Sequence, residues 1–452
     1  MIRHMLTSFL VLTTSLHLLN AAELKSDLSL GIQSQNFSNA NIDQQMNNSF
    51  DLSIVDERKF SKGKTKVEAH SQYFQEKSHL AYSLSELYYT HQFDRVIEVG
   101  VGRKRLDWSA DEGFWYLSNI NGAVGINFLD ERQEGKFGVH SRFQSENKKF
   151  HTELFASYFY VPSLNPRIDE EDGKIVRKSY WGRTPPSTVV VEGNQLDINY
   201  NVERPDVSDV VFKKSFGAKI GYDWTNVSVS AFGLYKPENQ LRINAQAFPD
   251  TSARIQATAA PIVNHHSVFG ADLSVHTKDK KVVVKNSFQV IDPNSNVFDD
   301  FVILDPIEQE RTGRIFETEY IKINPNYEKQ SYWFFDLKLP VAKRQSATIK
   351  TIAMLEGDKN FGDDFLTFAP LWRRGIGTEY QNQVLPKVSF RVKYLYDLRL
   401  KDQLISADSR YLWSKDSFFS FGAKLLRSPD TRSYWYDYRA NDLFSFGYTK
   451  IF

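Results

Sequence analysis

Long stretches in which apolar and polar residues alternate are the feature that most constrains this fold. In Val211–Trp224, written VFKKSFGAKIGYDW, the even-numbered residues are apolar except Lys214, and the odd-numbered residues after Val211 are polar or small. The stretch Lys387–Leu400 is similar. Successive side chains of a strand face opposite sides, so each stretch predicts a strand with one apolar face. The runs last about 10–12 residues, against about 5–6 in soluble sheets, which suits tilted strands crossing a bilayer.

Composition favours a barrel over a helical membrane protein. Aromatic residues make up 14% of the chain and charged residues 25%, and no run of 18 apolar residues follows the N-terminal region. Aromatic residues gather at the ends of alternating runs, as at Tyr222 and Trp224, where a membrane barrel has its aromatic girdle. We therefore predict an all-β fold, a transmembrane antiparallel up-and-down β-barrel.

The connections between the predicted strands alternate in length. Short turns are expected at 91–95, 145–150, 223–226, 277–281, 340–344 and 413–417, and long insertions at 106–135, 162–208, 237–264, 292–328 and 428–440. This asymmetry is typical of a barrel with short periplasmic turns and long extracellular loops. The pattern predicts about 18 strands, with 16 as the alternative, because residues 24–60 and 344–382 are weakly patterned.

The N-terminus has the features of a secretory signal peptide. Arg3 precedes an apolar run from Leu6 to Leu19, and small residues follow up to Ala21. A membrane-anchoring helix is the alternative, but the run is short and contains several Thr and Ser residues. We predict that residues 1–21 are removed and that residues 22–452 form a single barrel domain.

The last strand ends on an aromatic residue, with apolar residues at alternate positions before it. Phe444, Phe446, Tyr448 and Phe452 make up this pattern, and Lys450 departs from it. The ending resembles the C-terminal β-signal of Gram-negative outer-membrane proteins. The resemblance implies an outer-membrane location in lipid and lipopolysaccharide. It also implies assembly by the barrel-assembly machinery and periplasmic chaperones. An oligomer is left open.

Two arginines conflict with strict alternation in the segment DRVIEVGVGRKRLDW. If Val99 and Val101 face lipid, Arg103 and Arg105 would face it too, at a cost of about 2–4 kcal/mol for an arginine near the midplane. A bulge at Gly100 or Gly102 would turn both arginines inward. The alternative is that the strand ends at Gly102 and the arginines lie at the rim.

The same stretch, VGRKRLDW with a tryptophan-containing loop after it, resembles the GRQ-x-L-x-W segment of porin-like families. These include alginate-export-like and other substrate-specific barrels. The resemblance implies that the following loop folds into the lumen and narrows it. The implied residues at this constriction are Arg103, Arg105 and Asp107 on its approach, and Trp108, Phe114, Trp115 and Tyr116 on the loop. Lys104 and Ser109 depart from the family pattern.

Charged residues at the expected lumen-facing positions of five strands are mostly basic. The basic ones are Lys213, Lys219, Lys285, Lys338, Lys387, Arg391, Lys393 and Arg399, and the acidic ones are Asp223, Asp272, Asp336 and Asp397. The whole chain has a net charge of only +1, so no nucleic-acid partner is expected. The excess in the lumen predicts a mild preference for anions or carboxylates. Alternatively, acidic loops such as 168–172 fold inward and cancel it.

Other motifs give little support for catalysis or metal binding. The sequence NHHS at Asn264–Ser267 has hydrolase residue types, but consecutive residues of a strand face opposite sides. The sequence IDEEDGK at Ile168–Lys174 could hold calcium, although its spacing differs from an EF-hand. The chain has no cysteine, which excludes disulfides and thiolate ligands. We expect no enzymatic activity, no cofactor and no metal.

The sequence predicts a passive outer-membrane channel for small hydrophilic solutes. Two alternatives remain open. One is a polysaccharide exporter of the alginate-export type, and the other is a closed barrel that acts as an adhesin or scaffold through its surface loops. The insertion at 162–208 is long enough for the latter role.

Overall fold

The structure is a computed structural model. It describes residues 25–38, 46–75, 79–109, 111–123, 129, 132–163, 168–177, 185–191, 194–249, 254–279, 281–293, 321–323, 329–357 and 370–452. The predicted signal peptide lies outside the described residues.

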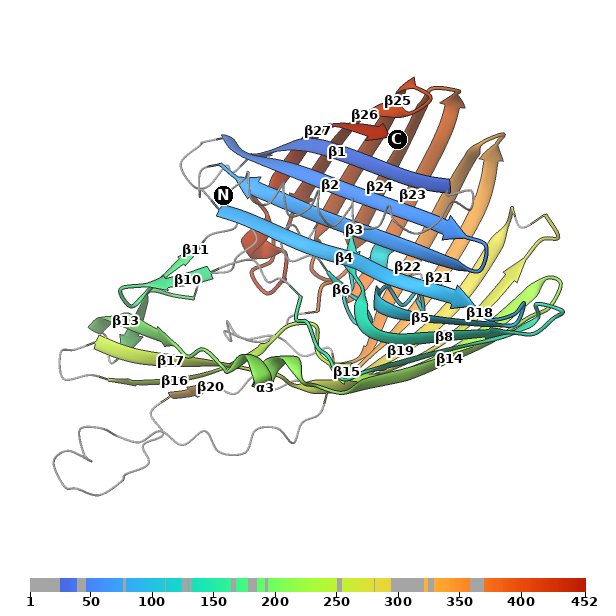
Figure 1. Ribbon diagram of the computed structural model, residues 1–452. Helices are drawn as coiled ribbons and strands as arrows, with labels where there is room; N and C mark the ends of the chain where they lie inside the picture. Colours follow the sequence, from blue (N-terminus) through green and yellow to red (C-terminus); the bar gives the residue numbers. More distant parts are fainter. Residues whose placement is uncertain are drawn as a thin grey trace.

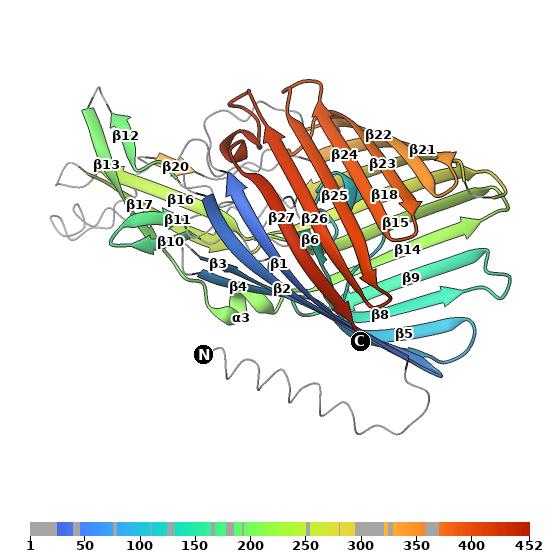
Figure 2. The same cartoon turned by 90° about the horizontal axis from the view of Figure 1, so that it is seen from above.

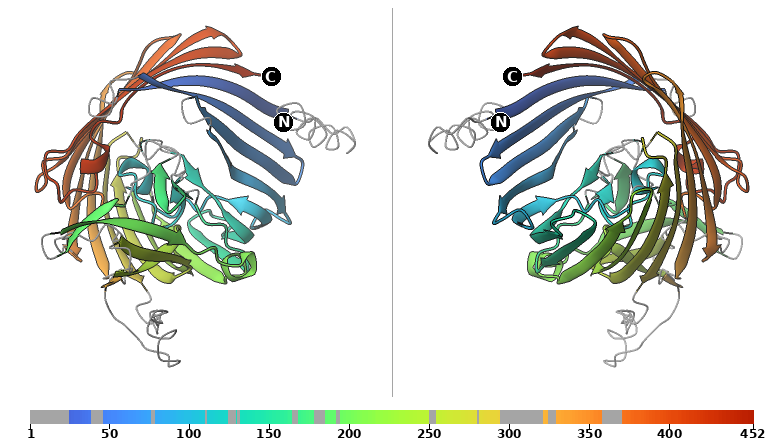
Figure 3. Two further views of the ribbon diagram at one scale, coloured as in Figure 1. Left: turned by 90° about the vertical axis from the view of Figure 1, so that its left-hand side faces the viewer. Right: turned by 90° about the vertical axis from the view of Figure 1, so that its right-hand side faces the viewer.

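Eighteen antiparallel strands form one closed barrel, which confirms the predicted fold class and strand number (Figures 1 and 3). Each barrel strand pairs with its neighbour along the chain, and the last pairs with the first. The barrel strands are β1 (Lys25–Ser38), β2 (Met46–Phe60), β3 (Gly63–Phe74), β4 (His79–Gln92), β5 (Ile97–Lys104), β8 (Lys136–Gln144), β9 (Phe150–Ser157), β14 (Ser215–Asp223), β15 (Val227–Pro237), β18 (His265–His276), β19 (Val283–Pro293), β21 (Gln330–Ala342), β22 (Gln345–Glu356), β23 (Arg374–Leu385), β24 (Val388–Asp397), β25 (Gln403–Ser414), β26 (Ser417–Arg427) and β27 (Asp442–Ile451).

The closure explains the aromatic C-terminus. Strand β27 is antiparallel to both β1 and β26, and the amide of Phe452 donates to the carbonyl of Leu28 at 2.8 Å. Phe444, Phe446 and Tyr448 lie on the outer face, each at least 38% exposed. Every backbone group of a spanning strand needs a partner in lipid, and this pairing leaves the barrel without an open edge.

The outer face of the barrel is apolar along the strands. Large hydrophobic side chains are exposed at alternate positions, including Ile32, Leu52, Tyr82, Val101, Leu154, Ile220, Phe269, Phe288, Ile349, Ile376, Ile405 and Phe421. Among the described residues, no helix is long and apolar enough to cross a membrane. Contiguous apolar surface of this extent is not found on soluble monomers, and it identifies the face in contact with lipid.

The long connections carry further elements, some inside the barrel and some beyond its end. They are α2 (Asp111–Phe114), β6 (Gly122–Ala123), β7 (Gln133–Glu134), β10 (Ile168–Glu171), β11 (Lys174–Arg177), β12 (Thr188–Val191), β13 (Asn194–Val202), α3 (Val207–Val211), β16 (Arg242–Pro249), β17 (Arg254–Ile262), β20 (Ile321–Ile323) and the 3-10 helix η3 (Tyr436–Tyr438). Strands β12, β13, β17, β16 and β20 form a five-stranded sheet, the loop sheet, which extends beyond the barrel (Figure 2).

Candidate functional site in the barrel interior

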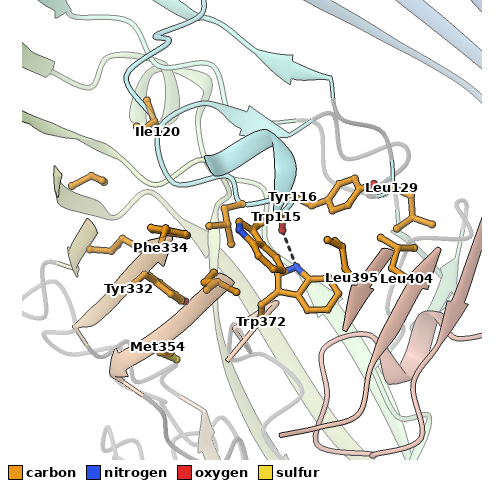
Figure 4. Packing of buried hydrophobic residues seen from close by; sticks show 14 of the residues in the cluster. Trp115, Tyr116, Ile120, Leu129, Tyr332, Phe334, Met354, Trp372, Leu395 and Leu404 are labelled. Atoms are coloured by element: carbon orange, nitrogen blue, oxygen red, sulfur yellow. Dashed lines mark hydrogen bonds between the residues drawn. The ribbon is translucent and has the colours of Figure 1, made fainter. Parts of the chain in front are cut away.

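The connection after β5 packs inside the barrel. We call its described residues 105–109 and 111–123 the infolded segment. Trp115 and Ile120 are fully buried, and Trp108 is 1% exposed. They form one cluster with inner-face residues of the barrel strands, among them Phe334 and Leu395 (Figure 4). The segment therefore fills part of the lumen with a dry apolar core.

Two other long connections meet the infolded segment through tryptophans. The indole of Trp372 donates to the carbonyl of Trp115 at 2.9 Å, and their rings are 5.8 Å apart (Figure 4). The indole of Trp435 donates to the carbonyl of Leu371, and its ring lies 5.7 Å from that of Trp372. Gly375 makes room, because a Cβ there would stand 2.8 Å from the Trp115 ring. Three distant parts of the chain thus share one packed centre.

Buried acids tie the helix α2 to the barrel. Asp111 is fully buried and pairs with Lys285 at 3.2 Å and Lys350 at 3.0 Å. Burial opposes ionisation of Asp111, but the two lysines hold its pKa below the ordinary value. Glu112 accepts from the amide of Ile120 at 2.8 Å, and burial raises the pKa of Glu112 to about 7. The two neighbouring carboxyls therefore differ in ionisation because only Asp111 forms ion pairs with lysines.

The structure turns both conflicting arginines toward the interior. Gly102 has a φ of 124°, a conformation that favours glycine, while the pairings of β5 with β4 and β8 contain no register shift. Arg103 pairs with Glu134 at 3.2 Å. Arg105 pairs with Glu68 at 3.1 Å and Glu86 at 2.9 Å. The reversal thus comes from a glycine conformation and not from the expected extra residue.

The sequence analysis did not identify the carboxylates that pair with these arginines. Glu68 and Glu86 lie opposite each other on β3 and β4, and Lys66 pairs with both. The lumen-facing position of Glu68 and Glu86 could have been predicted, because a charged residue in a spanning strand is expected to face the lumen. Glu134 precedes β8, and no sequence pattern pointed to it.

The other expected constriction residues lie on the infolded segment. The indole of Trp108 donates to Glu153 at 2.9 Å, and Lys219 donates to the backbone carbonyls of Asp107 and Trp108. Asp107 itself is exposed, whereas Tyr116 is 6% exposed. These contacts attach the start of the infolded segment to β9 and β14.

The basic residues expected to line the lumen divide into three groups. Lys219, Lys285 and Lys393 contact the infolded segment, and Lys393 lies 4.2 Å from the centre of the Tyr116 ring. Arg391 pairs with Asp408 at 3.3 Å, and Lys338 shares a face of β21 with Asp336. Lys213, Lys387 and Arg399 lie outside the strands, Lys387 in the short β23–β24 turn and the other two in connections at the long-loop end.

A polar cavity occupies the interior beside β1–β3 and β22–β27. It has a volume of about 830 Å³ and extends from Arg344 in the β21–β22 turn to Lys424 and Leu443 near the long-loop end. Its charged lining residues are Arg132, Arg344, Arg391, Arg410, Lys424, Asp51 and Asp408. Neither Arg344 nor Arg410 forms an ion pair with a residue that the structure describes. We call this space the arginine cavity, and sequence reasoning found only Arg391 of its basic residues.

The motifs considered for catalysis and calcium do not assemble a centre. His265 stacks on Tyr235, while His266 is buried and follows it on the opposite face of β18. The acidic sequence forms the hairpin β10–β11, in which Glu170 accepts from the amide of Gly173 at 2.8 Å. Within the described ranges, no group of three or more His, Asp or Glu residues is arranged to hold a metal.

The barrel is closed and antiparallel, with an apolar outer face and a charged interior. This is the architecture of outer-membrane proteins, because the strands pair their backbone groups with one another and only the outer face meets lipid. The chain is an outer-membrane, porin-like β-barrel. This agrees with the location expected from its C-terminus.

No protein-family model matches the chain, and no curated protein sequence matches it. Similar solved structures include OccK11 (OpdR) of Pseudomonas aeruginosa, with 9% identity, coverage of 95% of this chain and 96% of that one, and a TM-score of 0.47. OccAB1 of Acinetobacter baumannii has 10% identity, coverage of 95% and 96%, and a TM-score of 0.46. A triple mutant of Rhodopseudomonas blastica porin has 7% identity, coverage of 95% and 100%, and a TM-score of 0.39.

Proposed function

We propose that the protein is a passive channel for small hydrophilic solutes with a mild preference for anions, including carboxylates. The observation that carries the proposal is the arginine cavity. Five basic and two acidic side chains line it, and hydroxyl and amide groups such as Ser53, Gln33 and Ser420 fill positions between them. A polar lining lets hydrated solutes pass, and an excess of one charge raises the local concentration of the opposite ion.

The infolded segment is the proposed constriction. Trp108, Trp115 and Tyr116 are packed within it, and its approach consists of Arg103 on β5 with Arg105 and Asp107 at the start of the segment. The paired carboxylates of Arg103 and Arg105 make that approach nearly balanced in charge. Selectivity is therefore assigned mainly to Arg344 and Arg410, which lie in the cavity without such partners among the described residues.

Planar-bilayer recording tests this proposal. Purified protein should give steady openings, and the reversal potential across a potassium chloride gradient should show greater permeability to chloride than to potassium. Clear cation selectivity would contradict the anion preference. A complete lack of openings from correctly folded protein would contradict the channel itself.

A barrel that acts through its loops is the second candidate function. Two observations favour it: the apolar core around Trp115 narrows the interior, and the loop sheet presents an ordered surface beyond the barrel. Deletion of residues 185–202 separates the two candidates. A channel should keep its conductance after this deletion, whereas a loop-based adhesin should lose its binding to cells or matrix.

A further inference from the structure

The outer face carries a depression where five neighbouring strands place small residues between large ones. Across β9, β14, β15 and β18, the paired residues Leu154, Ala218, Gly233 and Phe269 form one row. Leu154 and Phe269 are each more than half exposed. The two small residues between them leave a groove with a volume of about 740 Å³, within the about 300–1,000 Å³ typical of ligand pockets. We call it the outer groove.

The next row toward the long-loop end completes the groove. It consists of Val139, Ala156, Phe216, Tyr235 and Ser267 on β8, β9, β14, β15 and β18. All five residues line the groove. Phe216 packs against Tyr235, with ring centres 5.3 Å apart. The groove is thus a lipid-facing hollow with aromatic walls and an open, small-residue floor.

Positive charge lies directly above this hollow. Lys214 is exposed and stands two residues before Phe216, just before β14 begins at Ser215. His265 stands two residues before Ser267 and stacks on Tyr235, with ring centres 5.1 Å apart. Lys213 is adjacent and half-buried. Among the neighbouring acids, Glu238 is paired with Arg242, and Asp206 and Asp209 belong to the N-cap and first turn of α3.

Exposed aromatic residues lie next to these lysines at the long-loop end of the barrel wall. Phe159 packs against Phe137 at 5.6 Å and Phe212 at 5.8 Å between ring centres. Phe212 directly precedes Lys213 and is 61% exposed. Aromatic residues at this level mark the membrane interface, where lipid phosphates lie.

We propose that the outer groove with Lys213 and Lys214 is a binding site for one phosphate-bearing lipid of the outer leaflet. One acyl chain lies over Ala218 and Gly233, and the phosphate lies at the two lysines. Charge complementarity selects this occupant, because an apolar hollow continuous with a cationic rim matches a lipid that has an anionic headgroup. The site is independent of solute passage, since it faces away from the lumen.

Native mass spectrometry of the detergent-purified protein with diphosphoryl lipid A tests the site. The protein should retain one lipid A molecule and should retain its dephosphorylated form at least about fivefold less. Lys213→Gln with Lys214→Gln should lower retention of lipid A to that of the dephosphorylated form. Ala218→Trp, which fills the groove, should lower retention of both forms.

Two matched variants serve as controls. Lys148→Gln with Lys415→Gln removes two exposed lysines from short turns, and Ala423→Trp enlarges a half-buried alanine on β26. Neither should change retention. Equal losses in test and control variants, or retention that does not depend on phosphate, would overturn the proposal. Heat-modifiable migration on a gel checks that every variant folds, and unchanged conductance distinguishes loss of this site from loss of the channel.

Discussion

The inner faces of β24–β27 differ sharply between the two ends of the barrel. Near the long-loop end they contribute Leu395, Leu404, Leu426 and Leu443, all less than 5% exposed, to the apolar core around Trp115. Toward the short-turn end the same faces line the arginine cavity with Arg391, Asp408, Arg410, Ser420, Ser445 and Thr449. Alternation assigns a residue to the inner or outer face, and the composition along the inner face then separates packed core from polar passage.

The largest expected effect comes from removing the centre of the packed end. Trp115→Ala should lower the free energy that holds the infolded segment in place by about 3–5 kcal/mol, because a fully buried tryptophan leaves a large cavity. The segment should leave the lumen for a larger fraction of time. Single-channel recording should show larger conductance, and limited proteolysis should cut within residues 105–123.

Trp413→Ala is the matched control for this variant. Trp413 lies near the short-turn end of β25 and is 63% exposed, so the same replacement creates no interior cavity. Its conductance should equal that of the unchanged protein. An equal rise in both variants would show that the packed core does not restrict the passage.

A smaller effect is expected from pH, through Glu112. Its folded-state pKa is about 7, against an ordinary value of 4.5, because the carboxyl is buried. The folded segment therefore binds the proton more tightly than the unfolded segment does. This contribution to stability is fully present below pH 4.5 and is lost as the pH rises through about 7.

Hydrogen exchange measures this pH effect. After correction for intrinsic rates, amides of residues 111–121 should be less protected at pH 8 than at pH 5. Glu112→Gln should remove most of the difference, whereas Glu146→Gln, in an exposed short turn, should leave it unchanged. Protection that rises with pH would contradict the assigned burial effect.

The cavity arginines should have a more modest effect on selectivity. Arg344→Gln with Arg410→Gln should lower the chloride-to-potassium permeability ratio by about twofold, since both charges lie in the passage. Lys174→Gln with Arg254→Gln removes the same charge from the hairpin β10–β11 and the loop sheet, and should leave the ratio unchanged. Reversal potentials measure both. Equal shifts would mean that total charge and not the cavity sets selectivity.

Much of the fold could be predicted from local sequence pattern. The contacts inside the barrel could not, because they join residues far apart in the sequence. The period of two marked the strands, and connection length marked the two ends of the barrel. Nothing local could reveal that Trp372 binds Trp115 across 257 residues of sequence. The inward turn of the arginines could be expected from the cost of charge in lipid, but their neutralisation by Glu68, Glu86 and Glu134 needed the strand neighbours.

The smallest expected effect on the reversal potential is that of replacing Arg103 and Glu134 together. It tests whether the two residues act as a balanced ion pair. Arg103 and Glu134 are 3.2 Å apart, with side chains only 11% and 3% exposed. Arg103→Gln alone leaves a buried negative charge without its partner, so anion selectivity should fall and folding should weaken. Arg103→Gln with Glu134→Gln removes both charges and leaves the net charge of the interior unchanged. The double variant should therefore have nearly the original reversal potential. The two single variants should shift it in opposite directions, Arg103→Gln toward lower and Glu134→Gln toward higher anion selectivity. A double variant with the same lowered anion selectivity as Arg103→Gln alone would show that this arginine acts as an isolated charge at the constriction.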